Sequence, residues 1–177
     1  MLSTLLAAFW IMVPAYVPNP VAAVCGGGMP IDFGKTYADG RRILGDGKTY
    51  RGLVCGVCAG IAVGFLQIWL FGTFGLTFLP QQTLASIVIL AFGALLGDMG
   101  KSFIKRRIGK NRGESWPIAD QYDLVAGAFI LMLVFDPAWI FTNVTWQILI
   151  VILILTPILH RTVNIIGYHI RVKKEPW

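Results

Sequence analysis

Charged residues are scarce in this chain of 177 residues, of which 14% are charged and 56% are hydrophobic. The mean hydropathy is +0.69. A soluble domain of this size needs many more ionisable groups to cover its surface, so the composition excludes a soluble globular protein. The apolar residues form five runs instead, each near the roughly 20 residues that cross a hydrocarbon core. These runs lie at about 2–18, 53–71, 82–101, 117–135 and 145–167. The sequence predicts an all-α, polytopic membrane helix bundle with five transmembrane helices, forming one domain over 1–177.

Lysine and arginine are absent from the segments after the second and fourth runs. Because basic residues collect on the cytoplasmic side of a membrane, this asymmetry predicts the amino terminus outside and the carboxyl terminus cytoplasmic. The cytoplasmic loops are then expected at about 19–52 and 102–116, and the missing basic n-region argues against a cleaved signal peptide. The fifteen basic residues are Lys35, Arg41, Arg42, Lys48, Arg51, Lys101, Lys105, Arg106, Arg107, Lys110, Arg112, Arg161, Arg171, Lys173 and Lys174.

Cysteine and histidine are also rare, with three and two residues. Cys25, Cys55 and Cys58 fall on or near the predicted cytoplasmic side, where disulfides are disfavoured. Cys55 and Cys58 have CxxC spacing, but no second pair or histidine cluster completes a zinc site. We expect them to be small packing residues, and we expect His160 and His169 to have packing or interfacial roles.

Acidic residues share the predicted cytoplasmic side with the basic ones, and only Asp136 is placed outside. Basic residues alone would suit binding to anionic lipid headgroups, and that interpretation stays open. Mixed acids and bases beside the membrane favour a different task, which is holding metal and phosphate together.

The first cytoplasmic loop contains the glycine-rich sequence GGGMPIDFGKTYADGRRILGDGKTYRG. Within it, Asp46, Lys48 and Thr49 offer a carboxylate, an ammonium and a hydroxyl beside two glycines that let a ligand approach the backbone. A P-loop is excluded, because its first glycine would have to stand at Arg42. The segment is either a phosphate cradle of another kind or a plain turn with Lys48 and Arg51 as interfacial anchors.

Asp98 lies in the last part of the third apolar run, where a carboxylate is unfavourable unless it is paired or metal-bound. If the helix continues, Asp98, Lys101, Ser102 and Lys105 follow i, i+3, i+4 and i+7 and share one face. A purely structural pair of Asp98 with Lys101 or Ser102 is the alternative.

Asp120 and Asp123 open the fourth run, after Pro117 at the expected first helical position. They lie on one helix face and repel each other unless a cation sits between them. The helix dipole explains Asp120 well and Asp123 poorly. Together with Asp98 they would form an oxygen-rich site that suits Mg²⁺ held jointly with a substrate phosphate.

A family resemblance covers most of the chain. The residues Gly97-Asp98, Ser102, Lys105-Arg106, Pro117 and Asp120-Gln121-Tyr122-Asp123 resemble the signature of membrane CTP:phosphatidate cytidylyltransferases. The loop 26–52, with the Pro-Asn-Pro that precedes it, resembles the archaeal branch of that family, the CDP-archaeol synthases. The bacterial PGHGG segment is absent and Gln121 stands where arginine is usual, which fits the shorter archaeal form.

This resemblance implies transfer of CMP from CTP to an isoprenoid glycerol-ether phosphate lipid, with release of pyrophosphate, in archaeal phospholipid biosynthesis. It implies a multi-pass enzyme of the cell membrane with its active site on the cytoplasmic side and no nucleic-acid partner. Mg²⁺ would be held by Asp98, Asp120 and Asp123, which with Lys101 would form the catalytic centre. Substrate-binding roles would fall to Asn19, Asp46, Lys48, Thr49, Lys105, Arg106 and Arg107.

The sequence also bears on two other functions. A CDP-alcohol phosphotransferase would continue from Asp39-Gly40 into an acid ladder, but Arg41 and Arg42 follow instead. A non-catalytic phosphate- or lipid-binding transporter or scaffold would place polar groups deep in several runs, and the second and fifth have almost none. The oligomeric state is left open, with a homodimer as one arrangement that would close the active site.

Overall fold

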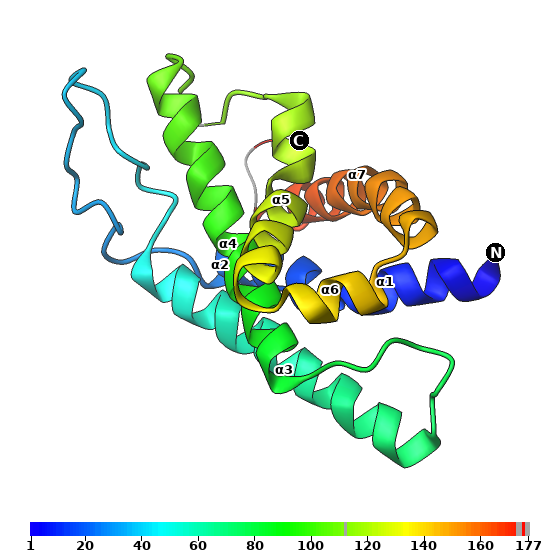
Figure 1. Cartoon of the computed structure of the whole chain (residues 1–177). Helices are drawn as coiled ribbons and strands as arrows, with labels where there is room; N and C mark the ends of the chain where they lie inside the picture. The colour runs from blue at the N-terminus through cyan, green and yellow to red at the C-terminus, as the bar shows by residue number, and fades with distance from the viewer. Residues whose placement is uncertain (112, 173–174, 176–177) are drawn as a thin grey trace.

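The computed structural model describes residues 1–111, 113–172 and 175, and in this part of the chain the fold is all-α (Figure 1). Within these described residues, five helical segments are long and apolar enough to cross a membrane, in agreement with the predicted five spans. Arg112, Lys173 and Lys174, expected on the cytoplasmic side, lie outside the described residues. The five segments are Leu2–Cys25, Tyr50–Phe74, Leu84–Arg107, Pro117–Phe135 and Trp146–His169.

The first span is longer than the expected 2–18, because helix α1 (Leu2–Tyr16) continues into helix α2 (Pro18–Cys25). Val17 between them keeps right-handed helical dihedrals, with φ −70° and ψ −37°. Pro18 has no N–H to give to the carbonyl of Pro14, so the path bends without ending. The predicted loop 19–52 is therefore wrong at both ends, since its irregular part spans 26–49 and Asn19 is helical.

Helix α3 (Tyr50–Phe74) packs through a row of glycines spaced four residues apart. A Cβ added to Gly60 would lie 2.6 Å from the Pro14 carbonyl oxygen, and one on Gly64 would lie 2.5 Å from Ile87. Residues four apart lie on one helix face, so the row lets α3 approach the backbones of α1 and α2 and the side chains of α4. This confirms that these glycines serve helix packing.

Helices α4 (Leu84–Arg107) and α5 (Pro117–Phe135) cross with their backbones in contact. A Cβ on Gly97 would lie 2.0 Å from the carbonyl oxygen of Asp123, and a Cβ on Gly127 would lie 2.2 Å from that of Gly93. Helix α4 continues beyond the predicted end at 101. Three basic residues in its last turn stabilise this end of the helix, because their charge interacts favourably with the helix dipole. The loop predicted at 102–116 is correspondingly shorter, at 108–116.

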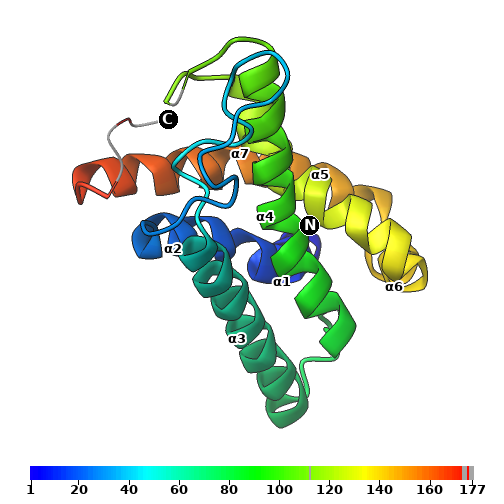
Figure 2. The ribbon, with the colours of Figure 1, turned by 90° about the vertical axis from the view of Figure 1, so that its left-hand side faces the viewer.

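The connection between α5 and α7 (Trp146–His169) contains a short helix, α6 (Pro137–Asn143). Asp136 caps it by accepting the Trp139 N–H at 3.1 Å. A core shared by α1, α4, α5 and α7 is built from Ile11, Met12, Leu90, Met132 and Ile152, none of which is exposed. Figure 2 shows the loop 26–49 lying across the last turns of α4. Ion pairs join the two there, between Lys48 and Asp98 and between Asp39 and Arg107.

Candidate active site

The loop 26–49 is organised around the carboxylate of Asp32, a residue that the sequence analysis missed. Its side chain is fully enclosed and binds the Arg42 guanidinium through contacts of 2.8 and 3.2 Å. It also accepts the N–H groups of Leu44 and Gly45, both at 2.9 Å. Burial alone would raise the pKa of Asp32, but these hydrogen bonds outweigh it and hold the pKa well below its usual range. The only available signal was an acid ten residues before the second of two paired arginines in one glycine-rich loop.

Arg107 fastens this loop to the end of α4. Its guanidinium donates to the Asp39 carboxylate at 2.6 Å and to the Arg42 carbonyl at 2.6 Å. It also lies over the rings of Tyr37 and Phe103, with 4.8 and 5.2 Å to the ring centroids. Arg107 was predicted to bind substrate, and the structure places its side chain against the loop.

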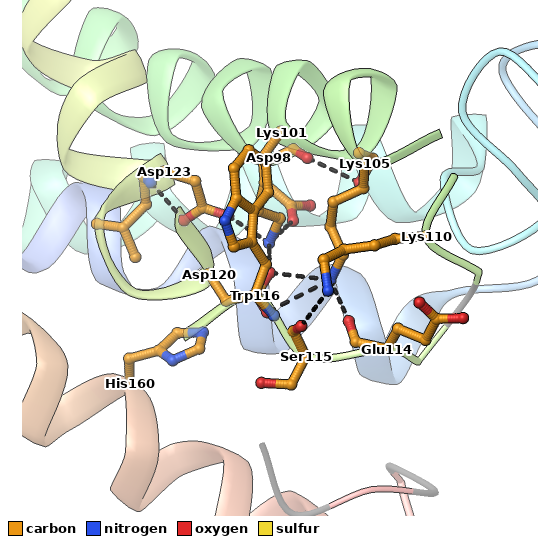
Figure 3. Close-up of polar contacts among 12 residues, drawn as sticks. Asp98, Lys101, Lys105, Lys110, Glu114, Ser115, Trp116, Asp120, Asp123 and His160 are labelled. Atoms are coloured by element: carbon orange, nitrogen blue, oxygen red, sulfur yellow. Dashed lines mark hydrogen bonds and ion pairs between the residues drawn. The ribbon is translucent and has the colours of Figure 1, made fainter. Parts of the chain in front are cut away.

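Lys101 stands at the centre of the three predicted carboxylates (Figure 3). Its Nζ lies 3.2 Å from Asp98, 3.2 Å from Asp120 and 2.6 Å from Asp123. Asp98 and Lys101 come from α4, whereas Asp120 and Asp123 come from the first turns of α5. The glycine crossing brings these two helices together, so the three predicted acids do gather, but the cation between them is the Lys101 ammonium. That they hold Mg²⁺ stays a prediction. The Asp98–Lys101 pair considered as an alternative is present as part of this larger cluster.

Two further lysines border the cluster. Lys48 leaves the loop to form an ion pair with Asp98. Lys105, one helical turn beyond Lys101, lies 3.2 and 3.3 Å from the two oxygens of Asp120 and also donates to the carbonyl of Glu114. Three carboxylates and three ammonium groups thus balance each other at the boundary between the loop and the helices.

The donor set fits Mg²⁺, because three carboxylates from two helices converge on one point with no histidine or cysteine among them. That point is taken by the Lys101 nitrogen, at 2.6–3.2 Å from all three. Across 1–111, 113–172 and 175, no group of three His, Cys, Asp or Glu residues is arranged to hold a metal ion directly. A metal at this place therefore requires Lys101 to move.

Two cavities meet at this cluster. The larger, of about 420 Å³, extends from the charged residues to apolar side chains of α2 and α7, including Val24, Leu159 and Val163. The smaller, of about 180 Å³, lies under the loop and is bounded by Leu44, Ser102, Arg106 and Asn111. Both are lined by Gly47, Lys48, Asp98, Lys101, Lys105 and Gly113. These six shared residues form a charged wall between the two cavities. The smaller cavity on one side of this wall is polar, and the larger cavity on the other side is amphiphilic.

The remaining predicted residues fall into two groups. Asn19 and Thr49 line the larger cavity, and Thr49 also caps α3 by accepting the Gly52 N–H at 3.1 Å. Asn19 Oδ1 is buried and has no hydrogen-bond partner within the described residues. Asp46 points away, paired with Arg42 at 2.7 Å, and like Arg107 it lines neither cavity.

Comparison with known proteins now adds to this geometry. A family model described as "CarS-like: CDP-archaeol synthase" matches residues 1–177. The CDP-archaeol synthase of Methanoregula boonei is 69% identical over 94% of this chain and all of its own length, and that of Methanoculleus marisnigri is 60% identical over the same shares. The chain belongs to the CDP-archaeol synthase family.

A solved structure, that of an intramembrane enzyme for archaeal membrane lipids biosynthesis, agrees with this family at the level of the fold. It is 36% identical to this chain, with a TM-score of 0.74 over 91% of this chain and 94% of its own. The resemblance to the archaeal branch that the sequence motifs indicated is thereby confirmed. The CDP-archaeol synthase family is thus supported by the whole chain and not by the loop motif alone.

Proposed function

We propose that the chain transfers CMP from CTP to an isoprenoid glycerol-ether phosphate, giving a CDP-archaeol-type lipid and pyrophosphate. CDP-archaeol synthase activity, which is that of a cytidylyltransferase in archaeal membrane lipid biosynthesis, follows from membership of the family. The assignment of roles to residues is supported chiefly by one observation, the charged wall that two chemically different cavities share.

Each cavity suits one substrate. The smaller one offers Lys48, Lys105 and Arg106, three cations that fit the phosphates of a nucleotide. The larger one offers apolar walls from α2 and α7 for hydrocarbon chains, and its volume is in the range of small-molecule sites. A lipid phosphate at the shared wall then lies beside the phosphates of CTP.

The reaction needs no covalent enzyme intermediate. An oxygen of the lipid phosphate attacks the α-phosphorus of CTP, and the bond to the β-phosphate oxygen breaks to release pyrophosphate. The attacking phosphate is already ionised at neutral pH, so no general base is required. The main barrier is the repulsion between two anions, which the lysines of the shared wall reduce.

The carboxylates of Asp98, Asp120 and Asp123 would hold Mg²⁺. When bound there, Mg²⁺ supplies positive charge that offsets the charge on the nucleotide phosphates and the leaving pyrophosphate. Lys101 is the remaining catalytic candidate, because its side chain lines both cavities.

The cytoplasmic side is the proposed location of this site. Lysine and arginine occur in the segments that meet at the charged wall and are absent from 75–83 and 136–145. CTP reaches such a site from the cytoplasm, and the lipid enters from the bilayer between helices. A homodimer stays a prediction, to be tested by the mass of the detergent-solubilised protein.

The test is a transfer assay with purified protein in detergent. It combines α-labelled CTP, Mg²⁺ and an isoprenoid glycerol-ether phosphate, and follows the label into the lipid phase. ATP, GTP, UTP and EDTA serve as controls. Metal-dependent labelling from CTP alone supports the proposal. A folded sample that transfers no label to this lipid or to phosphatidate contradicts it and favours the non-catalytic phosphate- or lipid-binding alternative.

A further inference from the structure

The Lys101 ammonium is the partner that all three carboxylates of the cluster share. Asp98 also pairs with Lys48, and Asp120 also pairs with Lys105. Asp123 is different, since within the described residues its ion pairs are with Lys101 alone, and its side chain is only 3% exposed. A nearly buried carboxylate without a cation is strongly destabilising, so something positive must stay beside Asp123.

The three carboxylates have little freedom to separate. Gly97 of α4 lies directly against the backbone of Asp123, and Gly127 lies against Gly93. Moving the acids apart would break this backbone contact and the packing around it. The repulsion among the acids must therefore be balanced within the fixed space between the two helices.

We propose that Lys101 is the resident counter-ion of the carboxylate cluster, and that a divalent cation replaces it when the site is loaded. This inference rests on the proposed function, because it assumes that the three carboxylates are the metal ligands. In the metal-free protein the ammonium occupies the point on which all three carboxylates converge. A divalent cation and the ammonium cannot share that point, both for lack of space and because like charges repel.

Once displaced by a metal ion, the Lys101 side chain can bind phosphate in either cavity. Lys101 lines both cavities, and its flexible four-carbon stem lets the ammonium turn from the carboxylates toward phosphate held in either one. Without phosphate, release leaves a partly buried ammonium unpaired. Metal alone should therefore bind weakly. Metal together with nucleotide should bind more tightly, because the displaced Lys101 ammonium then pairs with the nucleotide phosphates. Lys101 in this way couples the two binding events.

The experiment measures Mn²⁺ binding by electron paramagnetic resonance in the full-length, detergent-solubilised protein without nucleotide. The variants are Lys101→Met, which removes the charge at similar length, and Lys101→Arg, which keeps it. Lys110→Met is the matched control, because Lys110 donates to the Ser115 carbonyl at 3.0 Å and, among the described residues, forms no ion pair with the three carboxylates. We expect Lys101→Met to bind Mn²⁺ about tenfold or more tightly than the wild type, since no ion pair has to be broken first. Lys101→Arg and Lys110→Met should resemble the wild type.

A second measurement uses the unaltered protein and does not depend on the folding of a variant. An amine-acylating reagent is applied with and without saturating Mn²⁺, with occupancy followed on the same sample, and labelling is read by mass spectrometry. Lys101 should be protected without metal and become reactive with it, while Lys110 serves as the internal reference. Unchanged labelling of Lys101, or Mn²⁺ binding no tighter in Lys101→Met, overturns the inference.

The two proposals fail in different ways. If label passes from CTP to lipid but Lys101→Met binds Mn²⁺ no more tightly than the wild type, the counter-ion inference is wrong and the proposed function stands. If no label passes although Mn²⁺ binding rises in Lys101→Met, the exchange is supported and the proposed reaction is wrong.

Discussion

At the scale of the residue, charge placement explains the site better than charge number. Three carboxylates occur within reach of one ammonium because two helices each contribute acids on their facing sides. Asp46 carries the same charge, but it is 63% exposed and pairs with Arg42 in the loop. Whether an acid can take part in the site therefore depends on whether its helix or loop places it at the charged wall.

The acids of the cluster give the first prediction. Asp98→Asn, Asp120→Asn and Asp123→Asn should each lower the rate of CMP transfer by about a hundredfold or more, because each removes charge from the proposed site for metal and phosphate. Membrane insertion should be unaffected. Asp136→Asn is the control, since asparagine also caps a helix and position 136 is at the opposite end of α5. Full activity in all three cluster variants would falsify the site.

Asp32 gives the second prediction, which concerns stability. Asp32→Asn should lower the free energy of unfolding by about 2–4 kcal/mol, because it removes a buried charge that the Arg42 guanidinium and several N–H groups bind. Thermal unfolding in detergent and proteolysis within 26–49 measure the effect. Asp46→Asn, which removes the exposed partner of the same arginine, should have a smaller effect.

The same carboxylate predicts a pH dependence. Because its pKa in the folded protein lies below the ordinary value of 3.8, the unfolded chain takes up the proton first as the pH falls. The stabilisation is therefore complete well above pH 3.8 and is lost as the pH falls from there toward the folded pKa. The wild type and Asp32→Asn should approach each other in stability over that range, and a constant difference would contradict this account.

At the scale of the element, the helices were largely predictable and their contacts were not. Apolar runs locate the spans, and the i, i+3, i+7 spacing correctly placed Asp98, Lys101 and Lys105 on one face of α4. The end of α4 was missed, because the residues after 101 are charged and a hydropathy pattern cannot distinguish exposed helix from loop. Asp32 was missed because an irregular glycine-rich loop has no periodicity that reveals which side chain is buried. That Lys101 contacts all three acids depends on how α4 and α5 cross, which local sequence does not specify.

The crossing itself gives the next prediction. Gly97→Ala should destabilise the protein by about 1–3 kcal/mol or more and lower activity, because its Cβ would lie 2.0 Å from the Asp123 carbonyl oxygen. Gly100→Ala is the matched control on the same helix, since a Cβ there has nothing within 4 Å. Alanine is the better helix former, so this variant should be as stable as the wild type or slightly more stable. Equal behaviour of the two variants would show that the close crossing does not position the site.

At the scale of the whole molecule, the orientation in the membrane is the open question with the simplest test. In a background where Cys25, Cys55 and Cys58 are replaced by alanine, single cysteines are introduced as Ala38→Cys and Thr77→Cys, both at exposed loop positions. An impermeant thiol reagent applied to intact cells should label position 77 and should reach position 38 only after the membrane is opened. The reverse pattern would place the charged wall outside and contradict access by cytoplasmic CTP.

The wall shared by the two cavities also affects how a catalytic cycle ends. The liponucleotide product joins in one molecule the two groups that the substrates bring separately, so it can fill both cavities at once. Linking two bound fragments raises the affinity well above that of either alone. We therefore expect the product to have a long residence time and to inhibit competitively against both substrates. In the proposed arrangement pyrophosphate would contact the polar cavity only and should leave first. Removal of the lipid product from the enzyme would then limit the turnover rate.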